Sequence, residues 1–127
     1  MNKDIEKIAF DAIGAAIEVH KLLGPGLLER VYQECLAYEL RKLGYIVGVE
    51  VILPVRYKEI EFDSAYRIDL LINNILVVEV KAVDKLNEIY CAQLLSYLRL
   101  SNLKLGLLMN FNVPHLKSGI KRVVNNL

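Results

Sequence analysis

The sequence predicts an α/β protein in which two helices precede a β-sheet. Apolar residues recur at helical spacing from about Lys3, and Gly24-Pro25-Gly26 then supplies a stop signal. A second amphipathic run follows and ends at Gly44. Beyond it the apolar segments either alternate with polar residues or form short buried runs, which favours strands.

The order of the remaining elements follows from the same patterns. They are a strand over Ile46–Leu53, an exposed partner over Val55–Phe62, two apolar strands around Arg67–Leu71 and Ile75–Ala82, a helix capped by Asn87 and running to about Leu100, a buried strand over Leu105–Phe111, and a terminal edge strand over Gly119–Val124. Pro54 is interpreted as the break between the first two strands.

Length and composition favour one compact domain spanning residues 1–127. The chain is 54% hydrophobic and 24% charged, without a low-complexity tract, so disorder is not expected. It lacks an N-terminal signal core and any apolar run approaching the ~20 residues of a membrane span, so we expect a cytoplasmic protein. Cys35 and Cys91 have no metal-binding spacing and are interpreted as reduced thiols.

The net charge of +1 is unevenly distributed along the chain. Residues 89–127 carry five basic side chains and no Asp or Glu. This part of the molecule could face a polyanion, or its Lys and Arg could be ordinary solvated side chains. The sequence leaves both interpretations open.

The most informative residues are Asp69, Glu79 and Lys81, because they interrupt segments that otherwise have the composition of core strands. An unpaired carboxylate costs several kcal/mol to bury, so these groups should pair with each other or with a cation. Side chains alternate along a strand, which places Glu79 and Lys81 on one face with Ile75 and Val77. The pattern predicts a site for a divalent metal ion.

The turn at Asn73-Asn74 decides whether the two carboxylates meet. A two-residue turn would place Asp69 opposite Val78, on the other face of the sheet from Glu79. A three-residue loop over 72–74, with Asn74 left-handed, would pair Leu71 with Ile75 and Arg67 with Glu79, with Asp69 as a diagonal neighbour of Glu79. We therefore expect a loop of odd length.

These residues carry a resemblance to a known family. Asp69, followed ten residues later by Glu79-Val80-Lys81, resembles the signature of the PD-(D/E)XK nuclease superfamily. The segment Gly26–Tyr32 is similar to the pattern that names the GxxExxY family, and Gln93–Tyr97 to the Gln-x-x-x-Tyr motif of the RecB-like branch. The resemblance runs from about residue 13 to residue 124 and implies a restriction-endonuclease-like fold, with a mixed central sheet flanked by helices.

The resemblance also implies the chemistry of the site. It makes Asp69 and Glu79 ligands of Mg²⁺ or Mn²⁺, for which hard carboxylate oxygens are suited. It makes Lys81 the residue that positions or helps to deprotonate the attacking water, and that stabilises charge developing at phosphorus.

Four further residues are implied at the same site. Glu29 resembles an additional acidic ligand delivered by a helix, and the backbone carbonyl of Val80 is a further candidate ligand. Gln93 and Tyr97 lie one helical turn apart and could close over the metal and the scissile phosphate. Each has a structural alternative, because Glu29 could stabilise a helix N-terminus, and Gln93 and Tyr97 could be a polar surface residue and a core aromatic.

Some features depart from these motifs or carry no chemistry. Ile68 replaces the proline in the superfamily's name, which contributes backbone shape and not a reacting group. His20 is expected at the C-terminal end of the first helix in a structural role. Gly24-Pro25-Gly26 lacks the Lys and Ser/Thr of a P-loop, so we do not expect nucleotide binding.

The sequence therefore leaves two functions open. The first is a nuclease that hydrolyses phosphodiester bonds in DNA or RNA by a metal-activated water, with DNA favoured over RNA. The second is a non-catalytic module that binds nucleic acid or protein. Because the domain is small, specificity is expected to come from a homodimer or a partner protein.

Overall fold

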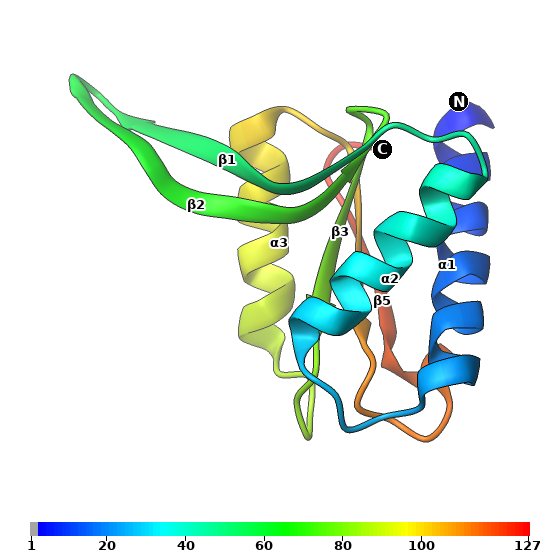
Figure 1. The fold of residues 1–127 in the computed structure, drawn as a ribbon. Coiled ribbons are helices and arrows are strands. Elements are labelled where there is room, and N and C mark those ends of the chain that lie inside the picture. Colours follow the sequence, from blue (N-terminus) through cyan, green and yellow to red (C-terminus); the bar gives the residue numbers. More distant parts are fainter. Residues whose placement is uncertain (1–2) are drawn as a thin grey trace.

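The computed structural model describes residues 3–127, which form a mixed β-sheet covered by helices on both faces. The elements are α1 (Lys3–Leu23), α2 (Glu29–Lys42), β1 (Val47–Tyr57), β2 (Ile60–Ile72), β3 (Leu76–Lys81), α3 (Glu88–Ser101), β4 (Leu105–Asn110), a short 3₁₀-helix η1 (Leu116–Gly119) and β5 (Ile120–Val124). The strands lie in sequence order across the sheet, with β3 and β4 parallel and the other neighbours antiparallel (Figure 1). This confirms the predicted α/β class and the two N-terminal helices.

Two hydrophobic cores lie on opposite faces of the sheet. The α1–α2 core receives Leu76, Val78 and Val80 from β3, whereas the α3 core receives Val77 from the same strand. The predicted alternation along β3 is therefore confirmed for these residues, and Glu79 belongs to the face that α3 covers. Ile75 was expected on that face but packs against the α1–α2 core, because it lies in the turn before the strand begins.

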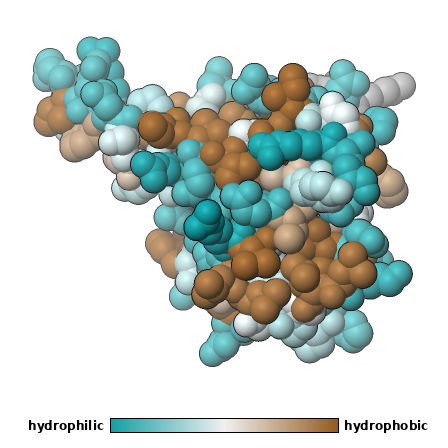
Figure 2. Space-filling model, viewed as in Figure 1, coloured by the Kyte–Doolittle hydropathy of each residue, from teal (hydrophilic) through white to brown (hydrophobic). Residues whose placement is uncertain are grey.

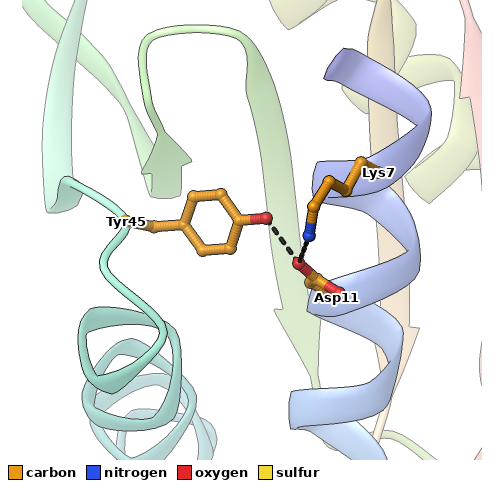
Figure 3. A network of polar contacts seen from close by, with 3 residues as sticks. All are labelled: Lys7, Asp11 and Tyr45. Atoms are coloured by element: carbon orange, nitrogen blue, oxygen red, sulfur yellow. Dashed lines mark hydrogen bonds and ion pairs between the residues drawn. The ribbon is translucent and has the colours of Figure 1, made fainter. Parts of the chain in front are cut away.

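The helices begin and end where their sequence signals place them. Asn87 caps α3 by accepting a hydrogen bond from the backbone N–H of Ile89 at 3.1 Å, as predicted. A network centred on Asp11 ties α1 to the segment between α2 and β1, because its Oδ2 accepts hydrogen bonds from Lys7 Nζ at 2.9 Å and from the Tyr45 hydroxyl at 2.5 Å (Figure 3). No helix within residues 3–127 has the length and apolar character that crossing a membrane requires.

The prediction that Pro54 separates two strands is wrong. β1 runs through Pro54 to Tyr57, and β2 continues from Ile60 to Ile72, so the expected four strands before α3 are three. Pro54 is tolerated because β1 is an edge strand and the β1–β2 register shifts between Leu53 and Val55. At this shift the strand does not need the backbone N–H that proline lacks for a hydrogen bond to β2. The resulting long hairpin reaches beyond α3 as an arm (Figure 1).

The β2–β3 turn has the predicted odd length but a different register. The pairs Leu71↔Val77 and Ile72↔Leu76 leave Asn73, Asn74 and Ile75 in the loop, not residues 72–74. Asn74 is left-handed as predicted, with a φ of 56°, and Asn73 is left-handed as well. Because both asparagines adopt this conformation, the turn begins one residue later than predicted. Each β2 residue therefore pairs with a β3 residue two positions further along the chain than predicted.

Candidate active site

The backbone ladder between β2 and β3 ends where the predicted carboxylates begin. Its last pair is Leu70↔Val78, and the same register places Asp69 opposite Glu79. There the side chains replace the backbone pairing, because the Asp69 N–H donates to Glu79 Oε2 at 2.9 Å and the Val80 N–H donates to Asp69 Oδ2 at 2.8 Å. The two carboxylates therefore meet in a gap between β2 and β3, and the expected pairing of Glu79 with Arg67 is wrong.

Burial makes this pair difficult to ionise. Glu79 is only 5% exposed, and burial, followed by the negative charge of Asp69, raises its pKa to about 8. Burial also raises the pKa of Asp69 to about 6, although the hydrogen bond from Val80 and the charge of Lys81 oppose the increase. At neutral pH the pair therefore tends to retain a proton unless a nearby cation neutralises both groups.

Lys81 is a cation whose charge acts on both carboxylates. It is the last residue of β3, and its charge lowers the pKa of both Asp69 and Glu79. Within residues 3–127 it forms no direct ion pair with either, and its Nζ lies 4.8 Å from the centre of the Tyr90 ring. The ammonium is held close to the site without being neutralised there.

Glu29 reaches the same end of the sheet from α2. Its Oε2 accepts a hydrogen bond from the backbone N–H of Ala82 at 3.1 Å. The preceding loop is fixed by the buried Tyr32, whose hydroxyl donates to the Gly24 carbonyl at 2.6 Å and accepts from the Leu27 N–H at 3.1 Å. Tyr32 therefore holds the turn from which α2 starts at Glu29.

The two predicted α3 residues differ in their relation to the carboxylates. Tyr97 is buried, and its pKa is raised to about 12 by burial and by the negative charge of Glu79, so it borders the site. Its ring lies 5.7 Å from that of Tyr66 on β2. Gln93 lies half-buried one turn earlier, and no hydrogen bond within residues 3–127 joins it to the carboxylates.

Two residues that sequence reasoning missed contact the site. The buried Gln33 donates from Nε2 to Glu50 Oε2 at 2.7 Å and to the carbonyl oxygen of Asp69 at 3.1 Å. The charge of Glu50 also raises the pKa of Asp69 and Glu79. A signal existed for both residues, because Gln33 lies one helical turn after Glu29 and Glu50 interrupts an apolar strand.

In β1 and β2, the face of the sheet to which alternate side chains point changes beside the two carboxylates. Val49 packs against the α1–α2 core and Val51 against the α3 core, although an even spacing would place them on one face. Their partners Leu70 and Ile68 divide between the cores in the same way. Glu50, between the two valines, has a left-handed φ of 54°, which accounts for the change of face.

The donor set suits a hard divalent cation that keeps part of its water. No three His, Cys, Asp or Glu side chains in residues 3–127 form a metal site by themselves. Mg²⁺ is commonly bound by one or two carboxylates together with water, and the burial that raises the pKa of Asp69 and Glu79 means that added positive charge in their shared gap is favourable. The Val80 N–H points into this gap. Because the carbonyl of a strand residue points to the same side as its N–H, the Val80 carbonyl faces the gap as well.

The model of the PD-(D/E)XK nuclease superfamily matches residues 6–123, nearly all of the chain. The chain belongs to this superfamily. Its mixed five-stranded sheet with flanking helices is consistent with the restriction-endonuclease-like fold that the sequence predicted. No curated protein and no solved structure matches the chain significantly.

Membership gives the general nature of the site. PD-(D/E)XK proteins form a nuclease superfamily, which implies binding to nucleic acid, and its nucleases generally use divalent metal ions. Asp69 and the Glu79-Val80-Lys81 segment both lie within the matched residues.

Proposed function

We propose that this protein is a nuclease that uses Mg²⁺ or Mn²⁺ to hydrolyse phosphodiester bonds, with DNA preferred to RNA. In this proposal residues 1–127 form one domain of the GxxExxY family within the RecB-like branch. The observation that carries the proposal is the Asp69–Glu79 pair, which closes the end of the β2–β3 ladder and is electrostatically unfavourable without a cation.

The proposed roles follow from the positions of the side chains. Asp69, Glu79, Glu29 and the Val80 carbonyl hold the ion, which when bound would neutralise phosphate charge and lower the pKa of an attached water. The Lys81 ammonium, held beside the gap without an ion pair, stabilises charge that develops on the phosphate.

Tyr97 and Gln93 form the α3 border of the proposed site. Tyr97 is buried beside Glu79 and limits access of water from that side. Gln93 lies one helical turn earlier and has no hydrogen bond to Asp69 or Glu79 within residues 3–127, so its proposed role is to contact the substrate. The free cysteines Cys35 and Cys91 support a cytoplasmic setting for this chemistry, because reduced thiols are usual there.

A second copy of the chain is part of the proposal. Apolar side chains are exposed where α1 ends and α2 begins, namely Leu22, Leu23, Leu27, Leu28 and Val31 (Figure 2). Arg30 and Glu34, one turn apart beside this patch, carry opposite charges that a two-fold related copy can match. Light scattering that finds only monomers of the wild type would refute the dimer and leave a partner protein as the occupant.

The nuclease proposal is tested by offering purified protein single-stranded, duplex, flap and junction substrates with Mg²⁺ or Mn²⁺. We expect cleavage of at least one DNA substrate, and a loss of roughly 100-fold or more in Lys81→Ala with metal binding retained. Lys7→Ala is the matched control, because Lys7 belongs to the distant Asp11 network and should cleave at the wild-type rate.

Two outcomes would contradict the proposal. If the wild type cleaves nothing yet binds nucleic acid equally with and without metal, the protein is a non-catalytic binding module. If Lys81→Ala cleaves at the wild-type rate, the assignment of Lys81 is wrong or the activity comes from a contaminant.

A further inference from the structure

Two hollows flank the segment that follows β4, and lysines line both. The first, of about 540 Å³, lies between the last turns of α1 and residues 114–117. Lys21 and Lys117 line it together with His20 and His115, and no Asp or Glu of the described residues 3–127 does. A hollow with this lining favours an anionic group.

The second hollow lies between the loop after β3 and the start of β5. It has a volume of about 260 Å³ and is lined by Lys85 and Lys121. Its one acidic residue, Asp84, accepts a long hydrogen bond of 3.5 Å from Asn112 Nδ2. The lining therefore carries more positive than negative charge.

Four lysines from three separate parts of the chain line these two hollows, and we call them the lysine surface: Lys21, Lys85, Lys117 and Lys121. All four are exposed, and none forms an ion pair within residues 3–127. Two of the other three cations in residues 89–127 are already engaged, because Arg122 pairs with Glu6 and Lys104 donates to the Asn126 carbonyl. The lysine surface is thus a local excess of charge on a nearly neutral chain.

The lysine surface lies at the same end of the sheet as the carboxylates. The loop containing Lys85 begins directly after β3 and is fixed to the end of β4, because the Asn110 side chain bonds both the N–H and the carbonyl of Val83. On the other side, the buried His20 ties α1 to the same segment through a 2.8 Å contact from Nε2 to the Val113 carbonyl. The connections after α1, β3 and β4 accordingly lie at one end of the molecule (Figure 1).

We infer that the lysine surface binds the phosphate backbone of a nucleic-acid strand on one side of its scissile phosphate. This inference rests on the proposed nuclease function, which places that phosphate at Asp69 and Glu79. Phosphates and not bases are the recognised groups, because the hollows have no Phe, Tyr or Trp on which a base could stack. Lysine acts on phosphate as a point charge, so the contact is independent of base sequence.

The test is the salt dependence of oligonucleotide binding in EDTA, where metal-dependent cleavage does not interfere. Fluorescence anisotropy compares the wild type with the double variant Lys21→Gln/Lys117→Gln. Affinity should fall roughly 10-fold or more, and the slope of log K against log salt should fall by roughly 1.5 to 2, as expected for two lost phosphate contacts. The matched control Lys42→Gln/Lys58→Gln removes the same charge from exposed lysines on α2 and the β1–β2 turn and should retain the wild-type slope.

Each other outcome overturns the inference. An equal loss in the control variant would mean that net charge, and not this surface, governs binding. Displacement of the oligonucleotide by inorganic phosphate at the same concentration as by unlabelled oligonucleotide would indicate a small-anion site. Unchanged binding in the double variant, with a wild type that cleaves DNA, would refute the lysine surface and leave the nuclease function intact. If the double variant loses affinity as expected while the wild type cleaves nothing with metal, the lysine surface binds nucleic acid but the nuclease function fails, and the placement of a scissile phosphate beside this surface fails with it.

Discussion

Carboxylates serve opposite purposes at two places in this molecule. Asp11 accepts hydrogen bonds from Tyr45 and from its own cation, Lys7, and these contacts lower its pKa (Figure 3). Glu79 accepts a hydrogen bond from the Asp69 N–H and Asp69 accepts one from the Val80 N–H, but neither carboxylate has a direct ion pair within residues 3–127, and burial raises the pKa of both. The fold therefore stabilises the charged form of Asp11, whereas it does not stabilise the charged form of the Asp69–Glu79 pair.

The difference separates a carboxylate that the fold stabilises in its charged form from the pair that we propose as the metal site. A carboxylate with a cation in its own fold gains nothing from an added ion. A buried pair that has no direct ion pair within residues 3–127, with the Lys81 ammonium over the Tyr90 ring, gains much from a divalent ion that can contact both groups. Metal and pH should therefore act on the Asp69–Glu79 pair and leave the Asp11 network unaffected.

The largest expected effect is on metal affinity. Asp69→Asn should weaken Mn²⁺ binding by at least roughly 10- to 100-fold, because it removes the charge of one of the three carboxylates proposed to hold the ion, a change comparable to or larger than loss of an outer-shell partner. It should also raise the melting temperature in EDTA, since removing one negative charge relieves the repulsion on Glu79. Calorimetric titration and thermal melting measure the two effects.

Asp11→Asn is the matched control for this substitution. It should leave Mn²⁺ affinity unchanged and lower the melting temperature, because Asp11 is stabilised in its charged form. Unchanged metal affinity in Asp69→Asn would exclude Asp69 as a ligand.

The next effect is a fall in stability with rising pH in the metal-free protein. The pKa values of Asp69 and Glu79, about 6 and about 8, exceed their ordinary values of 3.8 and 4.5, so the folded state binds more protons than the unfolded state between these limits. The pair's contribution is fully present below about pH 4 and is lost as pH rises to about 8. Thermal melts in EDTA should therefore show a melting temperature lower at pH 8.5 than at pH 5, by roughly 5 °C or more.

Two comparisons test the origin of this trend. Glu79→Gln should remove most of it, and adding Mn²⁺ should raise the melting temperature more at pH 8 than at pH 5.5. Asp11 cannot produce the trend, because its lowered pKa places its effect below the ordinary carboxyl range. The same pH dependence in Glu79→Gln as in the wild type would assign it to other groups.

Much of this architecture followed from local signals in the sequence. Periodicity and caps predicted the helices, as at Asn87, and the spacing from Asp69 to Glu79 required an odd turn. These predictions succeeded because each depends on residues close together in the chain. The composition of β3 also indicated the charged end of a buried strand, which is where Lys81 lies.

The errors arose where distant segments decide the outcome. The sequence predicts a strand end at Pro54 because nothing local indicates that β1 is an edge strand with a register shift at that point. The sequence around Asn73 is compatible with a three-residue loop over 72–74 or over 73–75. The structure has the second, in which Ile75 packs against the α1–α2 core. The signals for Gln33 and Glu50 lie within their own elements, but their contact joins α2 to β1, and no spacing in the sequence specifies that contact.

A smaller effect is expected from Tyr32→Phe, which tests how the loop before α2 supports the site. Loss of the hydroxyl removes its bonds to Gly24 and Leu27 and should cost about 1–2 kcal/mol of folding stability. Because the loop positions Glu29, cleavage should also fall severalfold. Tyr38→Phe, at an exposed position on α2, should change neither property, and full activity in Tyr32→Phe would show that Glu29 does not depend on the loop.

The smallest effect is expected from Tyr45→Phe, in the network where the fold supplies its own cation. The substitution removes the hydroxyl that donates to Asp11, but Lys7 still contacts this carboxylate and water can reach it, so the loss should be about 0.5–1 kcal/mol. Denaturant unfolding of Tyr45→Phe, Asp11→Asn and the double variant gives the coupling between the two residues, which should account for most of that loss. Mn²⁺ affinity and cleavage should equal those of the wild type. A change in metal affinity in Tyr45→Phe would mean that the two carboxylate groups communicate through the α1–α2 core, and the division between a structural and a functional carboxylate would then fail.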